Sequence, residues 1–154
     1  MISPFETNKW QTLPPGIHWA SWQEICDQLG FTEHRQNQLS GLYLGLLALK
    51  QAGCQTAFLD GSFATGKPNP NDFDVCYDLT NIDPDLLDKI FFDFSNHRQK
   101  QKDKYGGEFF PANLPATPSG IRYLEFFQIN KHTQTLKGII GIHLNTDLIA
   151  LEAS

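Results

Sequence analysis

The chain has 154 residues, of which 40% are hydrophobic, and a formal net charge of −5. This length predicts one domain with its own core, and the acidic balance argues against general nucleic-acid binding, which needs Lys and Arg facing phosphates. The apolar runs are far shorter than a membrane span, and no signal-peptide pattern opens the chain. Three widely spaced cysteines indicate neither a disulfide framework nor a thiolate zinc site. We therefore expect a cytoplasmic protein with no membrane partner.

The first third of the chain predicts an arm followed by two helices. Residues 1–20 contain Pro-Pro-Gly and show little periodicity, so we expect an extended N-terminal arm, followed by a single domain over residues 21–154. A Ser-x-x-Glu capping box predicts a short helix over residues 21–30. Leucines at helical spacing predict a longer helix over residues 32–53.

The most informative segment lies between two apolar runs, Thr56–Asp60 and Phe73–Tyr77, which we predict to be strands. The first run ends in the turn Gly61-Ser62, and Asp72 and Asp74 open the second. Successive side chains of a strand alternate faces, so both carboxylates are expected on one face. Their repulsion favours a bound divalent cation, and backbone N–H groups of the turn can bind phosphate oxygens.

The second half of the chain predicts a further helix and more strands. Asp83-Pro84 is typical of a helix start, and we expect this helix to continue, with a kink, to Tyr105. In order, these elements predict an α/β fold with a mixed sheet packed against helices. The remaining predicted elements are a strand at 108–110, a loop at 111–120, a helix or strand at 121–128, a turn at 130–135 and a strand at 139–144.

The segment around the two aspartates resembles the signature of the polymerase-β-type nucleotidyltransferase superfamily. That signature is an apolar residue, Gly-Ser, a short spacer and Asp-x-Asp, and Gly61, Ser62, Asp72 and Asp74 match it position by position. Further blocks of the chain are similar to small bacterial proteins with a predicted nucleotidyltransferase domain, and to minimal nucleotidyltransferase antitoxins. The resemblance implies a two-layer nucleotidyltransferase-like α/β fold.

The resemblance also implies a reaction: Mg²⁺-dependent transfer of a nucleotidyl group from a nucleoside triphosphate, such as ATP, to a hydroxyl of a protein, an RNA or a small molecule. Two Mg²⁺ ions would be held by Asp72, Asp74 and a third carboxylate. Glu108, at the start of the strand after the predicted helix, is the preferred third ligand. Glu125, in an apolar segment, is the alternative.

Other polar residues near these acids have two interpretations each. The basic run 98–104 is either a solvated helix end or a set of triphosphate ligands. Lys67 either reaches a phosphate or is simply exposed, and Asp60 is expected to cap a short helix after the turn. The candidate nucleotide-binding residues are Gly61, Ser62, Thr65, Lys67, Lys102 and Lys104.

Two alternative functions remain. Gly61, Gly66 and Lys67 have the spacing of a Walker A phosphate loop, but Pro68 stands where that loop needs a hydroxyl and a helical N–H, so we disfavour an ATPase. The second alternative keeps the nucleotidyltransferase fold without catalysis, as a binding module that masks a partner protein such as a toxin.

Overall fold

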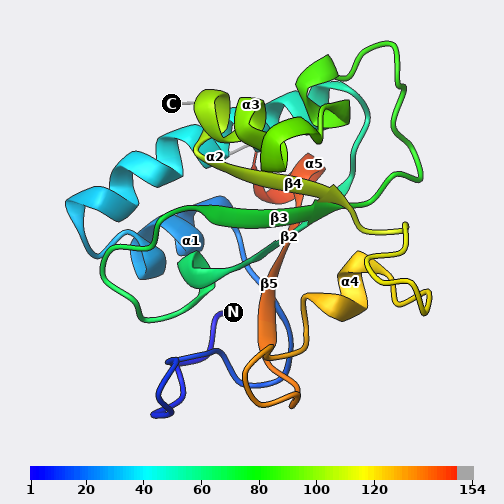
Figure 1. Cartoon of the computed structure of the whole chain (residues 1–154). Helices are drawn as coiled ribbons and strands as arrows, with labels where there is room; N and C mark the ends of the chain where they lie inside the picture. Colours follow the sequence, from blue (N-terminus) through cyan, green and yellow to red (C-terminus); the bar gives the residue numbers. More distant parts are fainter. Residues whose placement is uncertain (149–154) are drawn as a thin grey trace.

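The computed structural model describes residues 1–148 and has the predicted α/β class. Its mixed five-stranded sheet has the order β1-β5-β2-β3-β4 (Figure 1). The strands are β1 (Gly16–Trp19), β2 (Thr56–Asp60), β3 (Phe73–Tyr77), β4 (Gly107–Pro111) and β5 (Gly138–His143). The helices are α1 (Trp22–Leu29), α2 (Glu33–Gln51), α3 (Ser95–Tyr105), α4 (Tyr123–Phe126) and α5 (Leu144–Asp147), with 3-10 turns η1 (Ser62–Ala64) and η2 (Lys89–Phe92).

The pairing of the strands makes the sheet mixed, as predicted. The central strand β2 pairs antiparallel with both β3 and β5, whereas β1 with β5 and β3 with β4 are parallel pairs. The parallel pairs are possible because long connections through helices or loops separate their strands along the chain. The residue ranges predicted for β2 and β3 agree with the structure.

Alternation along the strands separates two apolar cores. Leu59 and Val75 point to a large core shared with the helices α1, α2, α3 and α5. Phe58 and Cys76 point to the opposite face, where they pack with Phe127 beside the short helix α4. Figure 1 shows α2 and α3 on one side of the sheet and α4 on the other. The face that carries α4 is only partly covered, and it is the face of Asp60 and Asp74.

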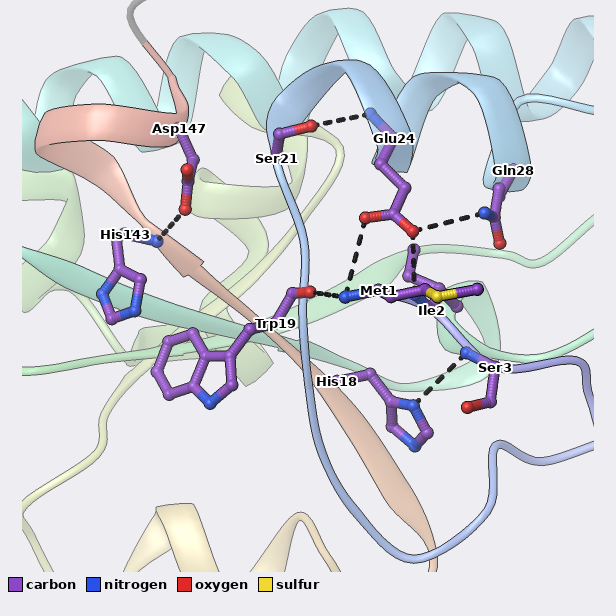
Figure 2. Close-up of polar contacts among 10 residues, drawn as sticks. All are labelled: Met1, Ile2, Ser3, His18, Trp19, Ser21, Glu24, Gln28, His143 and Asp147. Atoms are coloured by element: carbon purple, nitrogen blue, oxygen red, sulfur yellow. Dashed lines mark hydrogen bonds and ion pairs between the residues drawn. The ribbon is translucent and has the colours of Figure 1, made fainter.

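The predicted helix starts at Ser21 and Thr32 are confirmed. The Ser21 hydroxyl accepts from the Glu24 N–H at 3.1 Å, and the Thr32 hydroxyl accepts from the Arg35 N–H at 3.1 Å. Each bond satisfies one backbone donor that the first helical turn leaves free. The Glu24 carboxylate points toward the N-terminal residues and accepts from the Ile2 N–H at 2.9 Å (Figure 2).

The N-terminal segment contains a strand that the sequence did not predict. β1 pairs with β5 at the edge of the sheet, and Ile2 and Leu13 are buried in the large core. His18 fixes the segment from both ring nitrogens. Nε2 donates to the Pro14 carbonyl at 2.7 Å. Nδ1 accepts from the Ser3 N–H at 3.4 Å, as Figure 2 shows. The four residues of β1 are too few and too irregular in polarity to show a strand pattern.

The long helix predicted to begin at Asp83 is wrong in its first half. Residues 83–94 form turns and η2, and α3 begins only at Ser95. The physical reason is competition by aspartate side chains, since Asp83 accepts from the N–H of Asp85 and Asp88 from that of Ile90. Gly106, with φ of 86°, ends α3 as predicted.

Residues 121–128, whose sequence pattern fits either a helix or a strand, contain the one-turn helix α4. Within residues 1–148, no helix has both the length and the apolar character that a membrane crossing requires.

Candidate functional site

Three carboxylates lie side by side across neighbouring strands of the partly covered face. Asp74 of β3 is paired in register with Asp60 of β2 on one side and with Glu108 of β4 on the other. Residues paired in register project from the same face of a sheet, so we call Asp60, Asp74 and Glu108 the carboxylate row. Asp72 lies two residues before Asp74 and extends the row beyond the start of β3.

Asp74 lies at the centre of this negative charge. Burial, and then the charges of Asp72, Asp60 and Glu108, raise the pKa of Asp74 to about 7. Burial and the charge of Glu108 also raise the pKa of Asp72. No hydrogen bond from a described residue reaches either carboxylate. Both groups therefore carry unpaired acceptor oxygens in a region where a cation would be stabilised.

Cationic side chains neutralise both ends of the row. Lys137, immediately before β5, forms an ion pair with Asp60, and both side chains are buried or nearly so. At the other end, Arg98 Nε lies 2.6 Å and Lys102 Nζ 3.2 Å from the Glu108 carboxylate. No local pattern in the sequence points to Lys137, which is 77 positions from Asp60 along the chain.

The Gly61-Ser62 turn packs directly against Asp74. Gly61 has φ of 79°, and a Cβ atom built on it would lie 2.8 Å from Asp74 Oδ2. A side chain at position 61 would therefore collide with the central carboxylate and strain the backbone. The turn continues into η1, where the Thr65 hydroxyl donates to the Ser62 carbonyl at 2.6 Å. The expected cap from Asp60 is not present, because its carboxylate pairs with Lys137 and η1 has no side-chain cap.

Arg35 holds the loop that connects this turn to Asp72. Its guanidinium is completely buried and donates to the backbone carbonyls of Phe63, Thr65 and Lys67, at 2.5 to 2.9 Å. It also lies over the rings of Phe31 and Phe63. Burial lowers the pKa of Arg35 to about 10. The role of Arg35 is not visible in the sequence, because its hydrogen-bond partners are main-chain atoms.

The rest of the same loop is fixed by the first turns of α2. The Pro70 carbonyl receives hydrogen bonds from His34 and Gln38, and the Pro68 carbonyl receives one from Thr32. No helix follows Lys67, since the chain stays irregular until β3 begins. A Walker A loop needs such a helix, which agrees with the preference against that motif.

The remaining predicted site residues are spread around the row. Lys102 lies at its Glu108 end, whereas Lys104 pairs with Asp88 at 2.5 Å. Lys67 is exposed on the loop. Glu125 is exposed on α4, so the structure brings Glu108, and not Glu125, next to Asp74 in the sheet.

The donor chemistry of the row suits a hard divalent cation such as Mg²⁺, which prefers carboxylate oxygens. Asp72 and Asp74 offer unpaired oxygens, but Glu108 and Asp60 are engaged by cations. Within residues 1–148, no group of three or more Asp, Glu, His or Cys side chains is arranged so that it could hold a metal ion. Of these four carboxylates, only those of Asp72 and Asp74 have no ion pair or hydrogen bond from the described residues.

Comparison with protein-family models gives one match, to a family of unknown function (DUF6932), over residues 4–143. Neither the curated proteins nor the solved structures gave a match. The matched range includes the whole carboxylate row, Asp72, the Gly-Ser turn and all three neutralising cations. The chain therefore belongs to this family of unknown function, DUF6932.

Proposed function

We propose that the protein is a Mg²⁺-dependent nucleotidyltransferase that uses a nucleoside triphosphate, with ATP as the first candidate. The observation that carries the proposal is the position of Asp74, centred between Asp60 and Glu108 and packed against the Gly61 turn. A pair of unpaired carboxylates beside a glycine turn is the arrangement expected where a metal and a phosphate chain meet. The α/β sheet with its helices would then be a two-layer nucleotidyltransferase-like fold.

In this proposal Asp72 and Asp74 hold the metal, and Glu108 joins them when a second ion is bound. Bound Mg²⁺ would neutralise phosphate charge and lower the pKa of the attacking hydroxyl. Two features of the chain support these roles. Asp74 is held rigidly within the pairing of three strands, and Gly61 leaves its Oδ2 side free of any Cβ.

The proposal also assigns nucleotide-binding residues. The Gly61-Ser62 turn, next to Asp74, would bind a phosphate through backbone N–H groups. Lys102 already contacts an anion, the Glu108 carboxylate, and Lys67 is exposed on the loop that leads to Asp72. Thr65 supports the turn through its bond to Ser62. Lys104 would have to leave Asp88 to take part.

A second candidate function is a noncatalytic module of the same fold that masks a partner protein such as a toxin. One observation favours it: Lys137, Arg98 and Lys102 neutralise much of the row from within the chain. With the ends of the row neutralised in this way, the fold would not need a bound cation for its stability. The acids would then be structural remnants, and the partner would be covered by the protein surface.

Transfer of a labelled nucleotidyl group to an acceptor distinguishes the two functions. We would incubate the protein with Mg²⁺, a cell lysate and ATP labelled at the α-phosphate, and test the other triphosphates in parallel. A transferase should give a labelled protein or RNA band. Glu108→Gln should abolish the label, whereas the matched variant Glu125→Gln, exposed on α4, should keep it. Absence of label with every triphosphate, together with a partner that still co-purifies with Asp72, Asp74 and Glu108 variants, would favour the noncatalytic module.

A further inference from the structure

The first turn of α3 is left-handed. Asn96, His97 and Arg98 have φ of 50°, 53° and 59° and ψ of 49°, 42° and 34°. Residues with a Cβ disfavour this region because the Cβ approaches the following carbonyl oxygen, and they adopt it as single residues, not in runs. A run of three such residues persists only where other contacts hold it, and strain of this kind is concentrated at ligand clamps and switches.

The contact made by this turn is the one between Arg98 and the carboxylate row. Arg98 Nε donates to Glu108 Oε2 at 2.6 Å, and the guanidinium lies 4.7 Å from the centre of the Phe110 ring. Lys102, four residues later on α3, lies 3.2 Å from the other carboxylate oxygen, Oε1. The two cations thus clamp one carboxylate from two directions, and Arg98 does so from the last residue of the left-handed turn.

This clamp is open to solvent. The side chains of Arg98, Lys102 and Glu108 are 25%, 29% and 14% exposed. Guanidinium and ammonium groups that converge on one point bind phosphate oxygens as readily as a carboxylate. The pair has the chemistry of an anion site, and its present occupant is a side chain of the same protein.

We propose that Arg98 and Lys102 form a binding site for a polyphosphate chain, and that Glu108 occupies this site from within until such an anion displaces it. A polyphosphate carries several negative charges and competes with the single charge of a carboxylate. Once Arg98 leaves Glu108, the left-handed turn loses its ion pair and residues 96–98 relax to a right-handed helix, in which Arg98 and Lys102, four residues apart, still lie on one face. Glu108 is then free.

The inference rests on the proposed function in one respect: the freed Glu108 becomes the third carboxylate beside Asp72 and Asp74. The charge of Glu108 already acts on both aspartates, so the three groups are close enough to influence one another. Phosphate binding and completion of the metal site are therefore linked, and by reciprocity each one favours the other. In this proposal Glu108 joins Asp72 and Asp74 only after the polyphosphate chain has bound Arg98 and Lys102.

Anion binding measured without metal tests whether Glu108 competes with an anion for Arg98 and Lys102. Inorganic tripolyphosphate is titrated into the protein in EDTA, with calorimetry as the readout. Glu108→Gln removes the competitor and should tighten binding by about 10-fold, whereas Arg98→Gln should weaken it by about 10-fold. The matched control is Lys100→Gln, which removes the same charge from α3 at a residue that pairs with Asp93, and it should stay within about 2-fold.

Three results would overturn the proposal. The first is an affinity for tripolyphosphate that is unchanged or weaker in Glu108→Gln, and the second is an equal loss of affinity in Lys100→Gln and Arg98→Gln. The third is binding of ATP without binding of tripolyphosphate, which would show that the protein recognises the nucleoside. The same variants are examined by Cα chemical shifts of residues 96–98, which should move from left-handed to right-handed values in Glu108→Gln. A turn that stays left-handed there would show that the ion pair does not hold it.

The experiment is independent of catalysis, because it contains no metal and measures no turnover. Anion binding tightened by Glu108→Gln, with no labelled acceptor in the transfer assay, would keep this site and contradict the transferase. A labelled acceptor with no gain in anion affinity would keep the transferase and contradict this site.

Discussion

Asp74 faces Glu108 across the parallel pairing of β3 with β4. Two carboxylates at neighbouring positions of a sheet repel each other, and like charges directly opposite destabilise the pair. The fold tolerates this arrangement because Arg98 and Lys102 neutralise the charge of Glu108. Asp74 has no such partner, so the remaining electrostatic repulsion acts mainly on its carboxylate. Asp74 is therefore the residue at which the charge of the row and the stability of the fold are linked.

The stability of the metal-free protein should fall as the pH rises. The pKa of Asp74 is about 7 in the folded protein, against about 3.9 in an unfolded chain, so between these values the folded state binds more protons. Stability from the protonated form is fully present below the lower value and is lost as the pH passes 7. Urea unfolding in EDTA should show a loss on the order of 2–4 kcal/mol between pH 4 and 8.

Asp74→Asn should remove most of this slope and be more stable than the natural protein at pH 8, because the isosteric amide carries no charge. Asp103→Asn is the matched control, since Asp103 is exposed on α3 away from the row, and it should keep the slope. Equal slopes in Asp74→Asn and Asp103→Asn would contradict the assignment of the raised pKa to Asp74.

The ion pair between Lys137 and Asp60 should be essential for folding stability at neutral pH. Lys137→Met leaves the buried Asp60 carboxylate without its partner, and removing one partner of a buried pair costs about 3–5 kcal/mol. The double variant Asp60→Asn, Lys137→Met should regain much of that loss, because no buried charge remains. Lys131→Met, at an exposed position, serves as control. A single variant no less stable than this control would show that Asp60 is solvated in solution.

Arg35 should be irreplaceable by lysine. An ammonium group cannot donate along the several directions that the guanidinium uses, so Arg35→Lys leaves buried carbonyls of the loop without donors. We expect a loss of about 2–4 kcal/mol and faster amide exchange over residues 63–70. Arg122→Lys, exposed before α4, should change neither quantity. Similar unfolding curves for the two variants would contradict the role given to Arg35.

Local patterns predicted the central part of the fold well. The strands β2 and β3, the helix starts at Ser21 and Thr32 and the end of α3 at Gly106 depend on alternation, caps and a left-handed glycine, all of which are visible in short windows of sequence. The same alternation placed Asp72 and Asp74 on one face. The pairing of Asp74 with Glu108 then follows from β3 and β4 being neighbours.

The features that the sequence did not reveal depend on contacts between distant parts of the chain. Nothing near Lys137 indicates that it pairs with Asp60, and the partners of Arg35 are carbonyl groups that every residue possesses. The strand β1 forms by pairing with β5, which lies more than 100 positions away along the chain, so no local pattern reveals it. The turns over residues 83–94 replaced the predicted helix because aspartate side chains took the N–H groups that a helix would use.

We propose that Asp72 and Asp74 bind a metal–nucleotide complex, and calorimetry with ATP and Mg²⁺ tests this proposal most directly. We predict saturable binding by the natural protein that disappears in EDTA and in the double variant Asp72→Asn, Asp74→Asn. That variant should remain folded, because removing the repulsion within the row stabilises the metal-free protein. ATP binding that survives both EDTA and the double substitution would contradict the account.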